Sequence, residues 1–309
     1  MRIVSLLPGN TEMVCALGLQ DALVGVSHEC DYPPAVRDLP IVTNSRVNAA
    51  VSQAAIHEQV TALGREGGGL YTIDEHLLRR LEPNLILTQA RCAVCAIDYD
   101  EVLAIVGRLW PKDPPVVLSF QPHTIWEMLA DLHRVGRATD HEPVARQVVS
   151  ELLGRIQRVL ARVAQIPVLR RPRVVFLEWT EPLMSCGGML FEMIQLAGGR
   201  CQISKYGEKA AWTTPEAIVT AAPDVLVIGA CGLGAAANHE AGRQLAETEW
   251  FRQLPAVRNN RVYAVDGNAY FNRPGPRLVD SLEILADIFV DNLDRWTSQQ
   301  VLRVELPRG

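Results

Sequence analysis

The chain has 309 residues, of which 48% are hydrophobic and 21% are charged. These proportions exclude a disordered or collagen-like chain, and the length suits one large α/β unit or two domains of about 150 residues each. The formal net charge of −5 provides no general attraction to phosphate, so we expect no nucleic-acid partner.

The amino-terminal residues carry one positive charge and lack the apolar segment of about 7 to 15 residues that a signal peptide needs. No apolar run approaches the roughly 18 residues that span a bilayer. We therefore predict a cytoplasmic location, and a periplasmic or extracellular one only if a leader has been removed. Seven cysteines in a reducing compartment predict free thiols or a metal site rather than a disulfide framework.

Short, β-branched apolar runs alternate with helical patterns along the chain. This alternation predicts parallel βαβ units and an α/β fold. The helical patterns cover residues 11–18, 74–81, 98–109, 124–136 and 190–199. The expected strands are residues 2–6, 22–27, 84–89, 115–120, 173–179, 224–229 and 261–266.

Two segments, DEHLLRRLEPNLILTQ (74–89) and TPEAIVTAAPDVLVIG (214–229), share one pattern of helix, proline and buried strand. The first strands of the two halves of the chain, RIVSLLPG from residue 2 and RVVFLEWT from residue 173, also match. This likeness predicts two Rossmann-like lobes of similar topology. Residues 141–166 have a 3.6-residue apolar period and predict one long, stiff helix between the lobes. The expected organisation is a lobe at 1–140, the helix at 141–166 and a lobe at 167–309.

Parallel sheets bind ligands beyond the carboxyl ends of their strands. Residues that follow the expected strands are therefore candidate ligand contacts, and aromatic rings among them suit a large planar ligand. Gly187 and Gly188 open a predicted helix, where backbone N–H groups favour an anionic group or simply form a turn. The remaining candidates are Pro8, Asn10, His28, Glu29, Tyr71, Gln89, Cys92, Phe120, Trp179, Trp212, Tyr270, Phe271 and Arg273.

Cys92 and Cys95 form a C-x-x-C pair after an expected strand. Thiolate and imidazole suit soft or borderline metals, so the pair and His28 could form a metal site of unknown metal. A redox pair and simple packing residues are the alternatives. Imidazole is also an axial ligand of corrinoids and haems, whereas a lone histidine is often structural.

RIVSLLPGNTEMVCALG, LVGVSHECDYPP, RRLEPNLILTQ, the long central helix and GNAYFNRPGPRLVDSLEILADI together resemble the class III substrate-binding proteins of ABC importers, in the cobalamin-binding branch. The resemblance implies two α/β lobes, one rigid helix and a ligand held between the lobes. It also implies that Trp179, Trp212 and Tyr270 flank a corrin, and that an acidic residue on each lobe, Glu75 and Glu216, docks onto a permease if the chain is exported.

No nucleophile elbow, P-loop or HExxH motif occurs in the sequence. We expect a small-molecule binding protein without catalysis, with cobalamin or another corrinoid as its ligand. The alternatives are a haem, siderophore or metal-ion binder on the same scaffold, and a thiol- or metal-dependent enzyme that uses Cys92 and Cys95.

Overall fold

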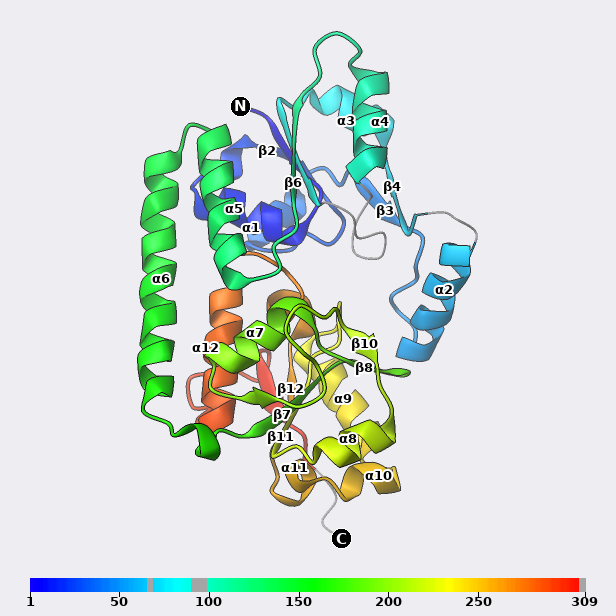
Figure 1. Cartoon of the computed structure of the whole chain (residues 1–309). Helices are drawn as coiled ribbons and strands as arrows, with labels where there is room; N and C mark the ends of the chain where they lie inside the picture. Colours follow the sequence, from blue (N-terminus) through cyan, green and yellow to red (C-terminus); the bar gives the residue numbers. More distant parts are fainter. Residues whose placement is uncertain (66–68, 90–98, 306–309) are drawn as a thin grey trace. The chain divides into compact units, whose positions relative to one another are not determined.

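The computed structural model describes residues 1–65, 69–89 and 99–305. The chain divides into two compact units (Figure 1). The first unit contains residues 1–122, 126–150 and 274–276, and the second contains residues 123–125, 151–273 and 277–309. Both units contain parallel strands with helices between them, as the sequence predicts.

The first unit has a four-stranded parallel sheet in the order β2-β1-β5-β6 and a separate antiparallel pair, β3 and β4. The strands are β1 (Ile3–Ser5), β2 (Leu23–Val26), β3 (Thr43–Ser45), β4 (Tyr71–Ile73), β5 (Leu85–Gln89) and β6 (Val116–Phe120). The helices are α1 (Pro8–Ala16), α2 (Gln53–Arg65), α3 (Glu75–Leu81), α4 (Tyr99–Leu109) and α5 (Ile125–Ala138), with 3-10 turns at Gln20–Ala22 and Pro34–Asp38.

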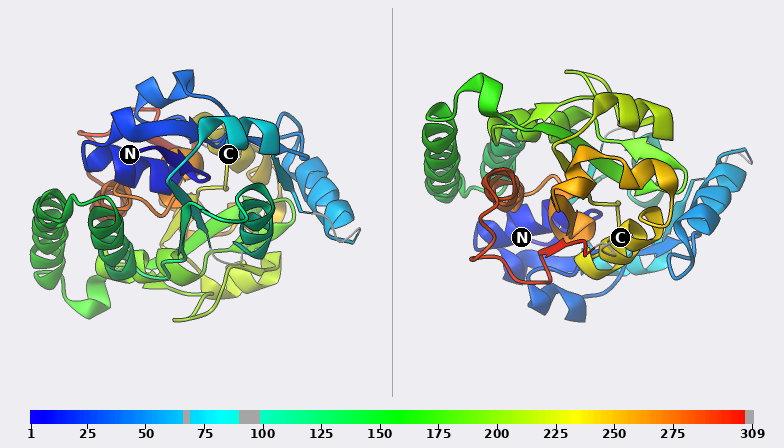
Figure 2. Two further views of the ribbon diagram at one scale, coloured as in Figure 1. Left: turned by 90° about the horizontal axis from the view of Figure 1, so that it is seen from above. Right: turned by 90° about the horizontal axis from the view of Figure 1, so that it is seen from below.

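Helix α6 (Glu142–Ala164) is a single helix of 23 residues, as the apolar period predicts. It follows α5 after a short turn, and its first part lies beside α5, seen end on in Figure 2. The two helices approach closely because Gly136 has no side chain: a Cβ there would lie 2.5 Å from the Cβ of Ala145. The second half of α6 belongs to the second unit, where Arg155 forms ion pairs with Asp280 and Glu283.

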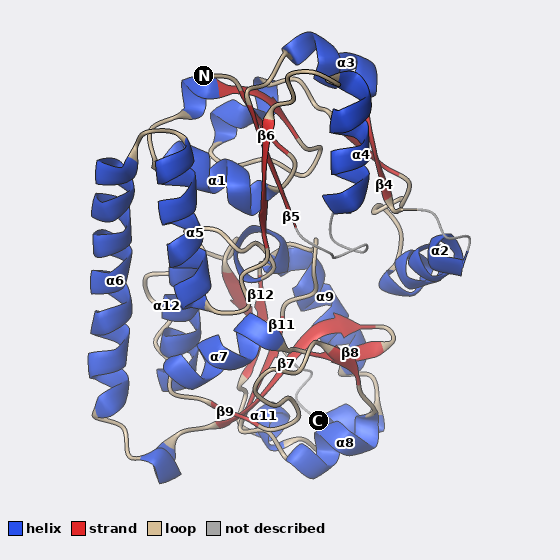
Figure 3. Cartoon of the chain, turned by 45° about the horizontal axis from the view of Figure 1, so that its top comes forward, coloured by secondary structure: helices blue, strands red, loops and turns tan. Residues whose placement is uncertain are grey.

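The second unit has a seven-stranded mixed sheet in the order β10-β8-β7-β11-β12-β13, with β9 also paired to β7. Strands β7, β11 and β12 are parallel (Figure 3). The strands are β7 (Arg173–Thr180), β8 (Leu183–Ser185), β9 (Arg200–Cys201), β10 (Ala211–Trp212), β11 (Val225–Ile228), β12 (Val262–Val265) and β13 (Val301–Arg303). The helices are α7 (Gly188–Leu196), α8 (Pro215–Ala221), α9 (Ala235–Leu245), α10 (Glu249–Arg252), α11 (Pro255–Arg258), α12 (Leu278–Val290), a 3-10 turn at Val168–Arg170 and a π-helix at Gly267–Phe271.

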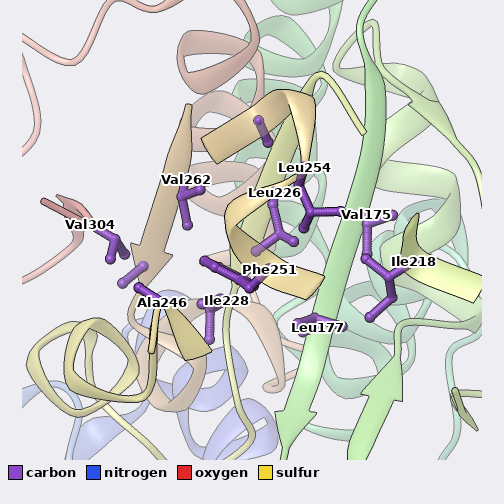
Figure 4. Close-up of a cluster of buried hydrophobic side chains, with 12 residues drawn as sticks. Val175, Leu177, Ile218, Leu226, Ile228, Ala246, Phe251, Leu254, Val262 and Val304 are labelled. Carbon is purple, nitrogen blue, oxygen red and sulfur yellow. The ribbon is translucent and has the colours of Figure 1, made fainter. Parts of the chain in front are cut away.

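One face of the second sheet forms the core that is shown in Figure 4. Alternate residues of each parallel strand point to this face because side chains in a strand alternate between its two faces. Phe251 of α10 is fully buried at the centre of the cluster. The strand and helix residues around it are Val175, Leu177, Leu226, Ile228, Val262, Ala264, Ile218, Leu254 and Ala256.

The two segments that resemble each other in sequence also share structural details. Asp74 caps α3 and Thr214 caps α8, each by accepting a hydrogen bond from the backbone N–H three residues later. Both helices end at a left-handed residue that precedes a proline. The Asn84 side chain then accepts a hydrogen bond from the backbone N–H of Arg2, and Asp224 accepts one from that of Arg173. The predicted likeness of these αβ segments is therefore confirmed locally.

Candidate functional site

The strand order places a switch point in the first sheet. The chain proceeds from β1 to β2 on one side and later to β5 on the other side of β1. In open parallel sheets, ligands bind at such a point, beyond the carboxyl ends of the strands. The candidate site of the first unit therefore lies beyond the carboxyl ends of β1 and β5.

A small cavity of about 50 Å³ lies at this point. The buried Asn10 side chain donates a hydrogen bond to the Thr88 carbonyl, 3.3 Å away. A pocket for a drug-sized ligand measures roughly 300–1,000 Å³, so this cavity suits one polar group of a ligand or a few waters. Three sequence candidates, Asn10, Gln89 and Phe120, meet here, and the lining also includes Leu7, Gly9, Gln121, Pro122 and Pro274.

His28 follows β2 and contacts the β3–β4 pair. Its Nδ1 lies 2.7 Å from the Thr43 hydroxyl oxygen, which also accepts a hydrogen bond from the His28 backbone N–H. The Tyr71 ring on β4 lies 5.3 Å from the imidazole, centroid to centroid. The structure thus brings together His28, Glu29 and Tyr71, three residues that the sequence nominates separately.

Burial lowers the pKa of His28 below its ordinary value, and the carboxylate of Glu29 opposes this only in part. The imidazole is therefore neutral at pH 7, which is the form that ligates a metal. Glu29 Oε1 is 4.0 Å from Nε2, and a quarter of the His28 side chain is exposed. When Nδ1–H donates to Thr43, the lone pair of Nε2 remains available for a ligand.

In the second unit, the carboxyl end of β7 meets the start of α7. The Glu178 side chain accepts a hydrogen bond from the Gly187 backbone N–H at 3.2 Å. Burial raises the pKa of Glu178 to about 7, and the hydrogen bond from Gly187 opposes the rise. A Cβ on Gly187 would lie 2.2 Å from backbone atoms of Lys209 and Ala210, so only glycine fits this close approach.

Two tryptophans lie in one row across the second sheet. Met184 of β8 pairs with Trp179 of β7 on one side and with Trp212 of β10 on the other. Directly opposed residues of antiparallel strands share a face, so Trp179 and Trp212 lie on either side of Met184, with about 10 Å between their strands. Trp179 is 9% exposed and donates from Nε1 to the Glu181 carbonyl, whereas Trp212 is 57% exposed.

The other nominated residues lie in mixed surroundings. Phe271 is buried and packs against Phe176, with the ring centroids 5.5 Å apart. Arg273 is also buried and donates to the Asn268 side chain. Tyr270 is half-buried beneath the Arg277 guanidinium, and Pro8 is buried at the first position of α1.

Cys92 and Cys95 lie outside the described residues. Within residues 1–65, 69–89 and 99–305, no group of three or more His, Cys, Asp or Glu side chains is arranged to hold a metal ion. The interpretation of this pair as a metal, redox or packing feature therefore stays a sequence-based prediction.

Both docking candidates occupy the first turn of a short helix. Glu75 of α3 forms an ion pair with Arg108, with 2.6 Å between Oε1 and a guanidinium nitrogen. Glu216 of α8 is exposed, and its pKa lies below the ordinary value because its own backbone N–H and the Thr214 hydroxyl donate to the carboxylate.

The sequence reasoning missed Thr43, Glu178 and Cys201. Glu178 carries a detectable signal, because it is the one charged residue inside the apolar run VVFLEW. Thr43 carries no such signal, because it lies in a strand of three residues and its partner, His28, is distant in the sequence.

A family model for periplasmic binding proteins matches residues 3–269. The chain is 24% identical over 295 residues to the vitamin B12-binding protein of Photorhabdus laumondii, a match that covers 94% of this chain and 89% of the relative. It is also 25% identical over 292 residues to the uncharacterized ABC transporter substrate-binding lipoprotein YvrC of Bacillus subtilis, covering 93% of this chain and 79% of the relative.

Solved structures share the fold. A periplasmic haem-binding protein of Pseudomonas aeruginosa superposes with a TM-score of 0.72 at 19% identity, covering 100% of this chain and 99% of the other. The periplasmic vitamin B12-binding protein of Vibrio cholerae superposes with a TM-score of 0.69 at 21% identity, covering 94% and 96%. These similarities confirm the predicted α/β fold of two lobes with parallel sheets.

The predicted cytoplasmic location is wrong. It depends on the amino-terminal residues alone, whereas the matching family and the structural neighbours are periplasmic and one sequence relative is a lipoprotein. Among the described residues, no helix combines the length and apolar character that crossing a bilayer requires.

The prediction of a protein without catalytic activity is confirmed by the family, and the thiol- or metal-dependent enzyme is thereby set aside. The relatives bind small ligands for ABC transport, and their names include vitamin B12 and haem. The chain belongs to the periplasmic binding protein family and is a non-catalytic ABC substrate-binding protein.

Proposed function

We propose that the protein binds a corrinoid such as cobalamin and delivers it to an ABC permease. The observation that carries the proposal is the similarity to vitamin B12-binding relatives along nearly the whole chain. The row of Trp179, Met184 and Trp212 supports it, because a large planar ligand is bound mainly through apolar and aromatic area. Trp212 is the more exposed of the two rings and therefore the better available contact.

Haem is the second candidate, and His28 is the observation that favours it. The neutral imidazole has Nδ1 beside Thr43, and its Nε2 can serve as an axial ligand of iron. The same imidazole could coordinate the cobalt of a corrinoid, so His28 supports both macrocycles. Absorbance spectra distinguish the two ligands, because the cobalt of a corrinoid and the iron of haem each give their own absorbance change on binding.

The binding test titrates hydroxocobalamin and haemin separately into the purified protein. The proposal predicts a stoichiometric absorbance change and a higher melting temperature with hydroxocobalamin, since a ligand that binds only the folded state stabilises it. A saturable response to haemin alone would replace the corrinoid with haem. No response to either ligand at saturating concentration would refute both assignments.

Two substitutions assign the contacts. Trp212→Ala is expected to weaken cobalamin binding by a factor of about 10, which corresponds to about 1.4 kcal/mol and suits the truncation of an aromatic contact. Trp126 is a matched control because it is a similarly exposed tryptophan, on α5. His28→Ala is expected to abolish the spectral sign of imidazole ligation, whereas His239→Ala on α9 should preserve it.

For the permease, we propose that Glu75 and Glu216 dock onto basic residues of the partner. Each carboxylate opens a helix, and the two helices occupy matching positions in similar αβ segments. The double variant Glu75→Gln/Glu216→Gln should bind ligand normally but lose ligand uptake in cells that depend on this protein. Normal uptake by the double variant would contradict the docking role.

A further inference from the structure

Cys186 and Cys201 lie along the same edge of β7. Strand β8 pairs with the carboxyl-terminal part of β7, and the Cys186 backbone N–H that follows it donates to the Phe176 carbonyl at 3.0 Å. Strand β9 pairs with the start of β7, where Cys201 is opposite Val174. The two cysteines therefore adjoin β7 positions two residues apart.

This register has two geometric consequences. Positions two apart in a strand are separated by about 6.6 Å, which falls within the usual Cα–Cα range of disulfides, about 4.4–6.8 Å. Residues two apart also point to the same face of the sheet, so the two thiols project to the same side. The strand register therefore predicts a spacing and a shared face for these cysteines that suit a disulfide.

The two side chains are in contact. The interaction between the two thiols is the main reason that the pKa of Cys201 is lowered to about 6 and that of Cys186 is raised. Backbone N–H groups of Ile203 and Ser204 and the Ser204 hydroxyl also favour the Cys201 thiolate. Ser204 Oγ is 3.7 Å from the Cys186 sulfur.

The two thiols differ in access. Cys201 is partly exposed and its lowered pKa favours the thiolate, so it is the better nucleophile of the two toward a disulfide reagent. Cys186 is 1% exposed and stays protonated until a partner sulfur is adjacent. This asymmetry is the arrangement that a two-step thiol–disulfide exchange requires.

We propose that Cys186 and Cys201 form a disulfide bond when the protein meets a disulfide oxidant, either a small molecule or a protein. The Cys201 thiolate attacks the oxidant's S–S bond, forms a mixed disulfide and releases one thiolate, which is protonated. Cys186 then loses its proton and attacks Cys201 Sγ, which releases the second thiol. Two electrons and two protons pass from the cysteine pair to the oxidant, whose disulfide becomes two thiols.

The expectation of free thiols depends on a cytoplasmic location, which the family contradicts. Disulfides persist in oxidising compartments, which include the bacterial periplasm. The bond would connect β9 to the turn that carries Gly187, whose N–H donates to Glu178. The proposal is independent of the ligand's identity.

The test is peptide mapping after equilibration with oxidised glutathione, blocking of free thiols and trypsin digestion without reduction. Trypsin cuts at Arg173, Arg200 and Lys205, so the two cysteines fall on separate peptides, 174–200 and 201–205. The proposal predicts that these peptides stay linked until reductant is added. Two separate, blocked peptides after full oxidation, or a link from either one to another cysteine, would overturn it.

A Cys92→Ser/Cys95→Ser background prevents the C-x-x-C pair from contributing. In this background, oxidation should lower the intact mass by 2 Da, as the loss of two hydrogens requires, and raise the melting temperature by on the order of 5 °C. Adding Cys201→Ser should remove both effects, whereas adding Cys231→Ser, at an exposed cysteine of the same unit, should preserve them. Equal responses of these two variants would refute the pairing.

Discussion

The raised pKa of Glu178 predicts a measurable pH dependence of folding stability. Its carboxyl has an ordinary pKa of 4.5, which burial raises to about 7 in the folded protein. Between these values the folded state holds a proton that the unfolded state has released, so stability falls as pH rises. At about 1.4 kcal/mol for each unit of pKa, the free energy of unfolding should decrease by up to about 3 kcal/mol between pH 4.5 and 8.

The perturbation is Glu178→Gln, which cannot ionise and keeps an oxygen to accept the Gly187 hydrogen bond. Urea unfolding of both proteins at pH 4.5, 6, 7 and 8 gives the free-energy difference between them. Other ionisable groups cancel in this difference, including His28, whose lowered pKa acts in the opposite direction. The wild type should lose stability relative to the variant as pH rises. A difference that stays constant within about 0.5 kcal/mol would refute the burial argument.

Three further predictions concern packing and charge and are tested by urea unfolding. Phe251→Ala should cost about 4 kcal/mol because it opens a cavity in a fully buried cluster, and a loss below about 1 kcal/mol would contradict that packing. Arg155→Met should lower the free energy of unfolding by about 2 kcal/mol, because Asp280 of α12 loses its ion pair with Arg155 and Glu283 keeps only the longer contact with Arg295; a loss below about 0.5 kcal/mol would contradict the ion-pair account. Gly187→Ala should lower the free energy of unfolding by about 2 kcal/mol, because its Cβ would collide with backbone atoms. Gly188→Ala should lower it by about 1 kcal/mol, because a Cβ there has open space but the residue has a φ of +49°. A larger loss for Gly188→Ala than for Gly187→Ala would be inconsistent with the close approach at Gly187.

The long strands and helices could be predicted because they are apolar and periodic. All seven expected strands are present, and the pattern at residues 141–166 forms α6. Short strands outside an apolar run, such as β3 and β8, carry no period that a sequence can reveal. Helix α2 was missed although Ile56, Val60 and Leu63 have the spacing of one helix face, and none of its residues is buried.

The candidate site, like the fold, could be predicted from the sequence only in part. His28 could be nominated because it follows an expected strand, and Tyr71 because it is aromatic, yet their contact depends on the β3–β4 pair. The Trp179–Met184–Trp212 row likewise results from the pairing of short antiparallel strands. Local pattern identifies residue types, whereas strand register decides which side chains meet.

The hydrogen bonds that Asn84 and Asp224 accept also bear on the order of folding. Asn84 fixes the start of β1 from 82 residues away, and Asp224 fixes the start of β7 from 51 residues away. The central pairings, β1 with β5 and β7 with β11, are therefore contacts of long sequence separation in both units. Because such contacts slow folding, we expect these pairings to form after the local pairings of β1 with β2 and of β7 with β8.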